Sequence, residues 1–447
     1  MRNNVPTILC LLTMLGFALM FVQTQWKPFK LEPLKGFTPV VEKPKLTFDN
    51  YVSDVYQKDV ENYVRDNFGF REFLIRAYNQ FTYSCFGKSN NENIKVGRNR
   101  ELYLKMYLEE IVGNTLRARY STVEETKAAA EQNVETTLRL VDTMQSHGTQ
   151  FLFVFAPSKT WIYPENMPWD YRNHVSDFSL EEYYIGLFKE KGIPCIDFLN
   201  YFKSWKNTSD YPLYTRTGTH WAASTLPFVT DSIMKKIGEL TGKDLPGVRC
   251  VDVPITTDYT EQDAELEENM NLLFPMRKPA LPRPIAALDD TMGKASVNLL
   301  VVGDSYFGTL LKTCFTDAFA RWDYWEYNKT VISSNPDYNF AKVVDLVDSY
   351  KVLEEADVVM AVFTAPMLYD YMFGFAETAF DLYEFARCDS CVKERKIQWM
   401  MTVIQSSPEW YDAVVKQAEE NGIPIEEALR GNAEYTVYKK SQNTHEE

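Results

Sequence analysis

A serine between a predicted strand and a predicted helix is the most chemically informative residue of this 447-residue chain. Ser305 lies in residues 297–311, VNLLVVGDSYFGTLL, where an apolar run ends at Gly303. Such a run is typical of a strand buried in a parallel sheet, and glycine permits the sharp turn that follows. At this turn the hydroxyl is exposed, and backbone N–H groups point toward any oxyanion formed there. We therefore predict that Ser305 is a nucleophile; the structural alternative is a serine that only caps a helix.

A histidine that could serve as the base lies in residues 214–221, YTRTGTHW. Of the four histidines, only His220 lies in a loop that a predicted helix, residues 221–240, follows. Imidazole is the side chain that takes up a proton near neutral pH, as a serine nucleophile requires. A structural histidine stacked on Trp221 is the alternative when this motif is considered alone.

The elements around these motifs alternate between apolar runs and helical periodicity. We expect strands at residues 150–156, 194–198, 297–302, 323–327 and 357–363, and helices at residues 122–146, 180–191, 340–355 and 395–438. This alternation predicts a three-layer α/β fold with a parallel sheet. Ser305 then lies at the carboxyl ends of the strands, where such sheets bind ligands.

Several further segments carry a family resemblance. They are residues 61–71 (ENYVRDNFGFR), 96–103 (VGRNRELY) and 151–159 (FLFVFAPSK), together with the His220 and Ser305 motifs in that order. With these landmarks the chain resembles the SGNH-hydrolase-like family of alginate O-acetyltransferases of AlgX/AlgJ type, in the versions found in Bacteroidetes-like bacteria. The resemblance implies an SGNH-like domain with a permuted motif order and a Ser305–His220 pair that transfers acetyl groups.

One position departs from the family pattern. The alginate enzymes carry Asp-x-His-Trp, and here Gly218 replaces the aspartate that orients the histidine. An imidazole without its carboxylate loses both orientation and stabilisation of its charged form. Asp304 is a candidate third member, although it is better suited to holding the turn through backbone hydrogen bonds. A backbone carbonyl that holds His220 is a further alternative.

Three other residues are candidates for substrate binding. Lys159 follows a predicted strand and is suited to an anion or a carbonyl, Trp221 to stacking against a sugar, and Tyr306 to contact beside the nucleophile. The structural alternatives are a solvated lysine and ordinary packing of the aromatic rings.

The composition restricts the partners. A net charge of −15 without a basic run argues against nucleic acid. Cys388 and Cys391 have a suggestive spacing, but no nearby pair or histidines complete a zinc site, so no metal or other cofactor is expected. A short disulfide and two free thiols are both compatible with the spacing.

We divide the chain into a signal anchor or transmembrane helix (1–26), an extended spacer with an N-terminal helical segment (27–115), the SGNH-like domain (116–390) and a C-terminal helical appendage (391–447). Residues 3–26 are uncharged and long enough to span a bilayer, and no clear cleavage site follows them. The flanking charges weakly favour a cytoplasmic body. The resemblance instead implies an inner-membrane anchor with the body in the periplasm or outside the cell.

Three functions remain open at this point. The first is O-acetyl transfer to hydroxyls of an exported polysaccharide, and for this the resemblance implies that a membrane-bound O-acyltransferase supplies the acetyl donor. The second is a carbohydrate esterase that uses the same two residues with water as the acceptor. The third is a non-catalytic glycan-binding or scaffold protein, which Gly218 favours.

Overall fold

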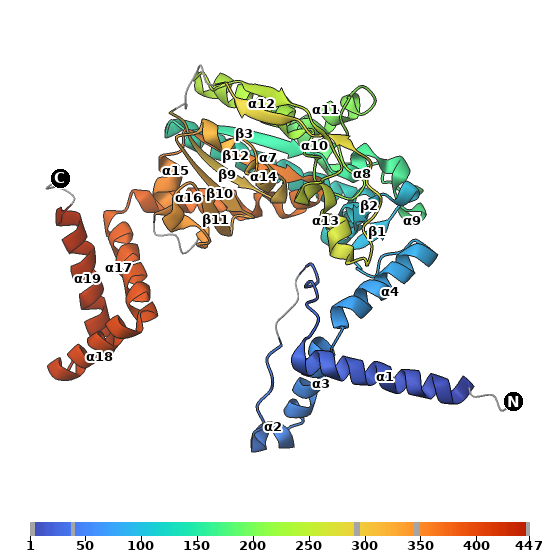
Figure 1. Ribbon diagram of the computed structural model, residues 1–447. Coiled ribbons are helices and arrows are strands. Elements are labelled where there is room, and N and C mark those ends of the chain that lie inside the picture. Colours follow the sequence, from blue (N-terminus) through green and yellow to red (C-terminus); the bar gives the residue numbers. More distant parts are fainter. Residues whose placement is uncertain (1–4, 37–40, 290–295, 344–347, 444–447) are drawn as a thin grey trace.

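The computed structural model describes residues 5–36, 41–289, 296–343 and 348–443. A six-stranded sheet with the order β11-β10-β9-β12-β3-β4 forms its centre (Figure 1). The strands are β3 (Gln150–Ala156), β4 (Cys195–Asp197), β9 (Asn298–Gly303), β10 (Arg321–Glu326), β11 (Thr330–Ser333) and β12 (Val358–Thr364). All neighbouring pairs are parallel except β10 with β11. The predicted parallel α/β sheet is confirmed, with one antiparallel edge strand that the prediction lacked.

Strand β12 lies inside the sheet, and every one of its residues is buried. It pairs with β3 on one side and with β9 on the other. A strand buried on both faces reads as an unbroken apolar run, and this is why the sequence revealed it so clearly.

Helices cover the sheet on both sides, and in the view of Figure 1 α12 and α16 lie on opposite sides of it. Those that follow the strand alternation are α7 (Val123–Ser146), α8 (Lys159–Ile162), α9 (Trp169–Arg172), α10 (Leu180–Lys191), α11 (Phe198–Trp205), α12 (Leu226–Thr241), α14 (Ser305–Leu310), α15 (Ser349–Glu354) and α16 (Phe375–Ala386). The hydroxyls of Thr122 and Ser179 cap the amino termini of α7 and α10, as expected for residues before a helix.

Two predicted helices are shorter than expected. The helix after His220 begins at Leu226, because Trp221 instead forms a β-bridge with Tyr214. Of the helix predicted at residues 340–355, α15 covers only the end, and residues 344–347 lie outside the described residues. Phe340 has a left-handed φ of 64° and is not helical.

The acidic, proline-rich segment between the two motifs folds into small elements of its own. They are β5 (Val248–Asp252), β6 (Ile255–Thr256), α13 (Glu261–Met270), β7 (Leu281–Pro282) and β8 (Ile285–Leu288). Strand β5 pairs with β8, and β6 pairs with β7, and α13 lies in the connection between β6 and β7.

The N-terminal part begins with α1 (Val5–Trp26), which is long and apolar enough to cross a membrane. It continues through α2 (Phe48–Val52), α3 (Val55–Asn67), α4 (Arg71–Phe86), β1 (Ile94–Val96), β2 (Leu102–Leu104), α5 (Lys105–Ile111) and α6 (Asn114–Tyr120). The spacer contacts the body, because Lys35 N–H donates to Asn271 Oδ1 at 2.8 Å. Tyr107 belongs to the main core, so the body includes residues before the expected boundary at 116.

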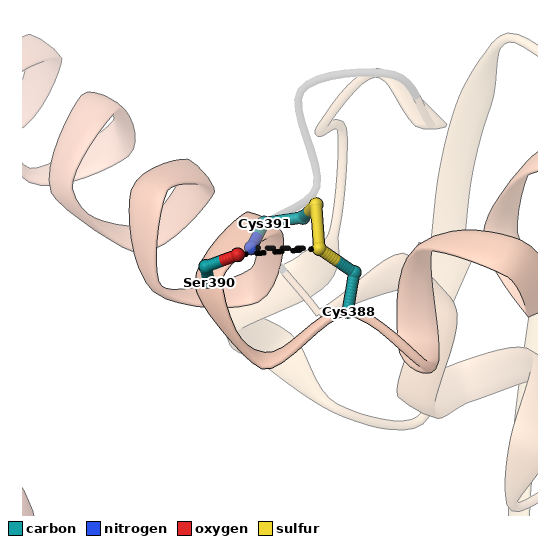
Figure 2. Close-up of a disulfide and its surroundings, with 3 residues drawn as sticks. All are labelled: Cys388, Ser390 and Cys391. Atoms are coloured by element: carbon teal, nitrogen blue, oxygen red, sulfur yellow. Dashed lines mark hydrogen bonds between the residues drawn. A yellow bond between two sulfur atoms is a disulfide. The ribbon is translucent and has the colours of Figure 1, made fainter.

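The C-terminal helices α17 (Asp389–Ser406), α18 (Pro408–Asn421) and α19 (Ile425–Asn443) pack around a small core of their own and lie beside the body (Figure 1). Cys388 and Cys391 form a disulfide at the start of α17 (Figure 2). The Cys388 sulfur also accepts a hydrogen bond from the Cys391 N–H, so this pair closes the first turn of the helix.

Candidate active site

Ser305 begins α14 directly after β9 and Asp304, as the sequence predicted for a strand-to-helix turn. A Cβ atom at Gly303 would lie 2.8 Å from the Val362 carbonyl oxygen, so only glycine allows β9 to approach β12 this closely. The Ser305 side chain remains partly exposed, whereas the residues on both sides of it are buried. The turn therefore presents one hydroxyl to solvent from an otherwise closed core.

Asp304 holds the turn together and does not contact His220. Its carboxylate accepts hydrogen bonds from the Tyr306 N–H at 3.0 Å and from the N–H and hydroxyl of Thr364 at 2.8 and 2.7 Å. Burial raises the pKa of Asp304, although the bonds from Thr364 and Tyr306 lower it. Asp304 as the third member of the triad is therefore corrected, and its role is to tie the turn to the end of β12.

His220 faces Ser305 across the carboxyl end of the sheet. Its Nε2 lies 2.9 Å from Ser305 Oγ, which is within the hydrogen-bond reach expected of a base and its nucleophile. The ring packs against Tyr306, with 4.8 Å between the ring centroids. Two motifs 85 residues apart in sequence therefore meet at one point.

Glu265 on α13 supplies the carboxylate that the His220 motif lacks. Its Oε2 lies 2.7 Å from His220 Nδ1, and its Oε1 accepts from the backbone N–H groups of Thr219 at 2.7 Å and His220 at 3.2 Å. A carboxylate at Nδ1 selects the tautomer that leaves Nε2 free to accept a proton. The arrangement has the geometry of a Ser-His-Glu triad, and no backbone carbonyl is needed to hold the imidazole.

Gly218 leaves room for α13. A Cβ atom there would lie 2.3 Å from the Gln262 carbonyl oxygen and 2.9 Å from Thr215 Oγ1. Thr215 and Thr217 donate their hydroxyls to the Asp263 carbonyl oxygen, at 2.5 and 2.7 Å. The glycine is thus the contact point between the histidine loop and the helix that carries the acid.

Lys159 is buried, and the expectation that it binds substrate is wrong. Its ammonium donates to the carbonyl oxygens of Leu102, Thr215, Arg216 and Gly218, at 2.7–3.2 Å. It also pairs with Glu101 at 2.8 Å. Burial lowers the pKa of Lys159, while Glu101 raises it. The lysine therefore holds the histidine loop through its backbone carbonyl oxygens.

Trp221 and Tyr306 are fully buried, so the structure contradicts the substrate contacts expected of them. Trp221 Nε1 donates to Thr309 Oγ1 at 2.6 Å, and the Tyr306 hydroxyl donates to the Thr219 carbonyl oxygen at 2.7 Å. Both residues join the His220 loop to α14. They fix the separation of His220 and Ser305.

Sequence reasoning missed Glu265. The available signal was an acidic helical stretch, residues 261–268, between the two motifs. That stretch also holds Glu261, Asp263, Glu267 and Glu268, and only the tertiary contact with Gly218 selects one of the five.

Residues 116–310 match the family model described as SGNH hydrolase-like domain, acetyltransferase AlgX. No curated protein matches the sequence significantly. Three similar solved structures are the O-acetyltransferase domain of Pseudomonas putida AlgJ (15% identity, TM-score 0.38, 64% of this chain and 99% of that chain), Pseudomonas aeruginosa AlgX (12%, 0.39, 64% and 67%) and Bacillus cereus PatB1 (12%, 0.34, 55% and 92%). Over residues 116–310, somewhat less than half of its length, the chain is therefore similar to the SGNH hydrolase-like acetyltransferase domain of AlgX.

Proposed function

We propose that this protein transfers acetyl groups to hydroxyls of an exported cell-surface polysaccharide through an acetyl-Ser305 intermediate. The observation that supports the proposal is the chain of contacts from Glu265 to His220 Nδ1 at 2.7 Å and from His220 Nε2 to Ser305 Oγ at 2.9 Å. Nucleophile, base and orienting acid are the three parts that serine acyl transfer requires.

In the first half-reaction, Ser305 Oγ attacks the carbonyl carbon of the acetyl donor, and His220 Nε2 accepts the hydroxyl proton. Glu265 stabilises the imidazolium that forms. The tetrahedral intermediate collapses, the donor group leaves with the proton from His220, and acetyl-Ser305 remains. In the second half-reaction, a sugar hydroxyl gives its proton to His220 and attacks the acetyl group, which restores Ser305 with the same proton.

The setting that we propose is supported by α1 and by the similarity of residues 116–310 to AlgX. α1 anchors the chain in the inner membrane, the body faces the periplasm or the cell exterior, and a membrane-bound O-acyltransferase partner supplies acetyl groups. The net charge of −15 means that an acidic glycan needs a local basic surface to bind.

The test uses the full chain in detergent with 4-nitrophenyl acetate, with and without a panel of neutral and acidic oligosaccharides. We expect intact mass to show one acetyl group on the wild type, passed to sugar when an acceptor is present, and none on Ser305→Ala. Ser204→Ala, which changes an exposed serine of α11, is the matched control and should behave as wild type.

Two results would contradict the proposal. Undiminished transfer by Ser305→Ala would exclude this nucleophile. Release of acetate at the same rate with and without every sugar would identify an esterase.

A further inference from the structure

The turn between β10 and β11 places a tyrosine beside the nucleophile. Glu326, the last residue of β10, pairs with Gly303 of β9, so Tyr327 lies just beyond the carboxyl end of the sheet. Its N–H donates to the Gly303 carbonyl oxygen at 2.8 Å. The turn is therefore anchored one residue before Asp304 and two before Ser305.

Tyr327 is held in a strained backbone conformation. Tyr327 and Asn328 have φ angles of 50° and 51°, in the left-handed region that bulky side chains avoid. Such strain persists only where surrounding contacts impose it, and it concentrates at functional sites. The strain alone identifies no function, but it shows that the position of Tyr327 is maintained at an energetic cost.

The contacts that impose it come from the segment after β12. Asn328 Nδ2 donates to the Phe373 carbonyl oxygen at 3.1 Å and to Thr378 Oγ1 at 3.0 Å. The Tyr327 ring packs edge-on against Phe373, with 5.2 Å between centroids. The backbone of Tyr327 is thus bound to the sheet, and its ring packs against the 3₁₀ segment Ala365–Gly374.

The phenol of Tyr327 lies close enough to Ser305 to interact with its side chain and its backbone. Burial and the charge of Asp304 raise the pKa of this phenol, the interactions with Ser305 lower it, and the net pKa is raised. The phenol is therefore protonated at neutral pH and able to donate. The space beside the Ser305 N–H and Oγ is also where the carbonyl oxygen of an acyl group on Ser305 must lie.

We propose that Tyr327 is a catalytic residue whose hydroxyl donates a hydrogen bond to the oxyanion of the tetrahedral intermediate, together with the Ser305 N–H. This inference rests on the proposed function. The incoming carbonyl oxygen takes the place that the phenol occupies next to the Ser305 N–H, and the phenol turns to donate to it. As Ser305 attacks, the carbonyl π electrons move onto that oxygen; they return when the leaving group departs. The phenol keeps its proton throughout.

The test is Tyr327→Phe in the full chain in detergent, because this change removes the hydroxyl and keeps the ring against Phe373. Loss of one oxyanion donor lowers kcat by about 10²-fold or more. We expect that fall in the rate of Ser305 acetylation by 4-nitrophenyl acetate, with KM within about twofold of wild type and an unchanged Tm. Tyr338→Phe is the matched control, since it removes a hydroxyl from the segment after β11, where the Tyr338 ring lies against Arg321.

A second measurement separates a donor from a merely structural ring. The sulfur of a thionoester is a weak hydrogen-bond acceptor, so the preference for the oxygen ester over its thionoester should narrow in Tyr327→Phe. It should stay at the wild-type value in Tyr338→Phe.

The two proposals fail in different ways. If Ser305→Ala abolishes acetylation while Tyr327→Phe acetylates at the wild-type rate, the role of Tyr327 is overturned and the proposed function stands. If Ser305→Ala retains transfer, both are overturned. An unchanged ester preference in a slower Tyr327→Phe enzyme would also overturn the donor role.

Discussion

Glu265 determines which nitrogen of His220 faces Ser305. One of its oxygens contacts Nδ1, while the other accepts two backbone N–H groups of the histidine loop. The carboxylate thus orients the ring and the loop at once. An acid with this double contact acts on catalysis through geometry as well as through charge.

Glu265→Gln should keep the fold and lose most of the activity. The amide is nearly isosteric with the carboxylate, but it cannot stabilise the imidazolium and can favour the wrong tautomer. In a full triad the orienting acid contributes up to about 10⁴-fold in kcat. Acetyl transfer by the purified variant is the measurement, with Glu268→Gln on the same helix as the control. A loss below about tenfold would show that Glu265 is dispensable.

Gly218→Asp tests whether the aspartate that the alginate enzymes carry at this position can act in this chain. The new side chain would meet the Gln262 carbonyl oxygen, which is 2.3 Å from an ideal Cβ atom. Because α13 backbone fills this space, we expect a lower Tm and lower activity, and no rescue of Glu265→Gln. The measurements are thermal unfolding and acetyl transfer of Gly218→Asp, of Glu265→Gln and of the variant that combines both changes. Higher activity in the combined variant than in Glu265→Gln would refute the expectation.

At the scale of elements, the histidine loop is held by contacts from segments far apart in the chain. Lys159 at the start of α8 joins the loop to β2, since its ammonium donates to both Leu102 and Thr215. The Leu102 N–H in turn donates to the Arg216 carbonyl oxygen at 2.9 Å. Strand β2 therefore supports the active site although it precedes the residues that match the family model.

Lys159→Met should destabilise the fold and reduce activity together. It leaves Glu101 and several buried carbonyl oxygens without their cation, and removal of one partner of a buried pair costs about 3–5 kcal/mol. Chemical denaturation gives the loss of unfolding free energy, and acetyl transfer below the denaturation midpoint gives the activity. Lys189→Met, which removes an exposed pairing with Asp197, is the control. Full activity in a strongly destabilised Lys159→Met would show that the loop does not depend on this lysine.

The elements that the sequence predicted well share one physical property. The strands β3, β9 and β12 are buried on both faces, so their apolar runs are visible without any tertiary information. The serine turn was predictable because glycine permits a sharp turn after a buried strand, and the histidine loop was predictable because the chain has only four histidines. Lys159, Trp221 and Tyr306 were misjudged because burial, which decides between binding and support, depends on contacts from other segments. Glu265 required knowledge of where α13 packs.

At the scale of the whole molecule, two acids lie buried inside the protein. Glu181 is fully buried, and its two carboxyl oxygens have no hydrogen-bond partner among the described residues. Glu110 accepts a hydrogen bond from Trp161 Nε1 at 3.0 Å. Burial raises the pKa of Glu110 to about 8 and that of Glu181 well above its usual value. Both are therefore neutral in the folded protein at pH 7.

Because these two acids are neutral when buried, we expect the free energy of unfolding to fall as the pH rises. The unfolded chain ionises glutamate from about pH 4.3, while the folded chain keeps the protons, so folding is most favourable below that pH. Each neutral group then costs up to about 1.4 kcal/mol per pH unit until it ionises in the folded state, near pH 8 for Glu110. Urea denaturation between pH 5 and 8 should show a shallower fall for Glu181→Gln than for wild type or for Glu190→Gln, an exposed control on α10. If the unfolding free energy fell equally steeply with pH in the wild type and in both variants, Glu181 would not be a neutral acid in the folded protein.

The position of β12 has a consequence for the order in which the protein matures. The chain is made from its amino terminus, yet the strand that separates β3 from β9 is formed by Val358–Thr364, near the end of the body. Until those residues have emerged, neither neighbour can complete its ladder, and Asp304 lacks Thr364 as its partner. Long-range closure of this kind is slow, and it exposes unpaired strand edges in the meantime. A chain that stalls or is cut before residue 358 would therefore carry both histidine and serine motifs and still have no assembled catalytic centre.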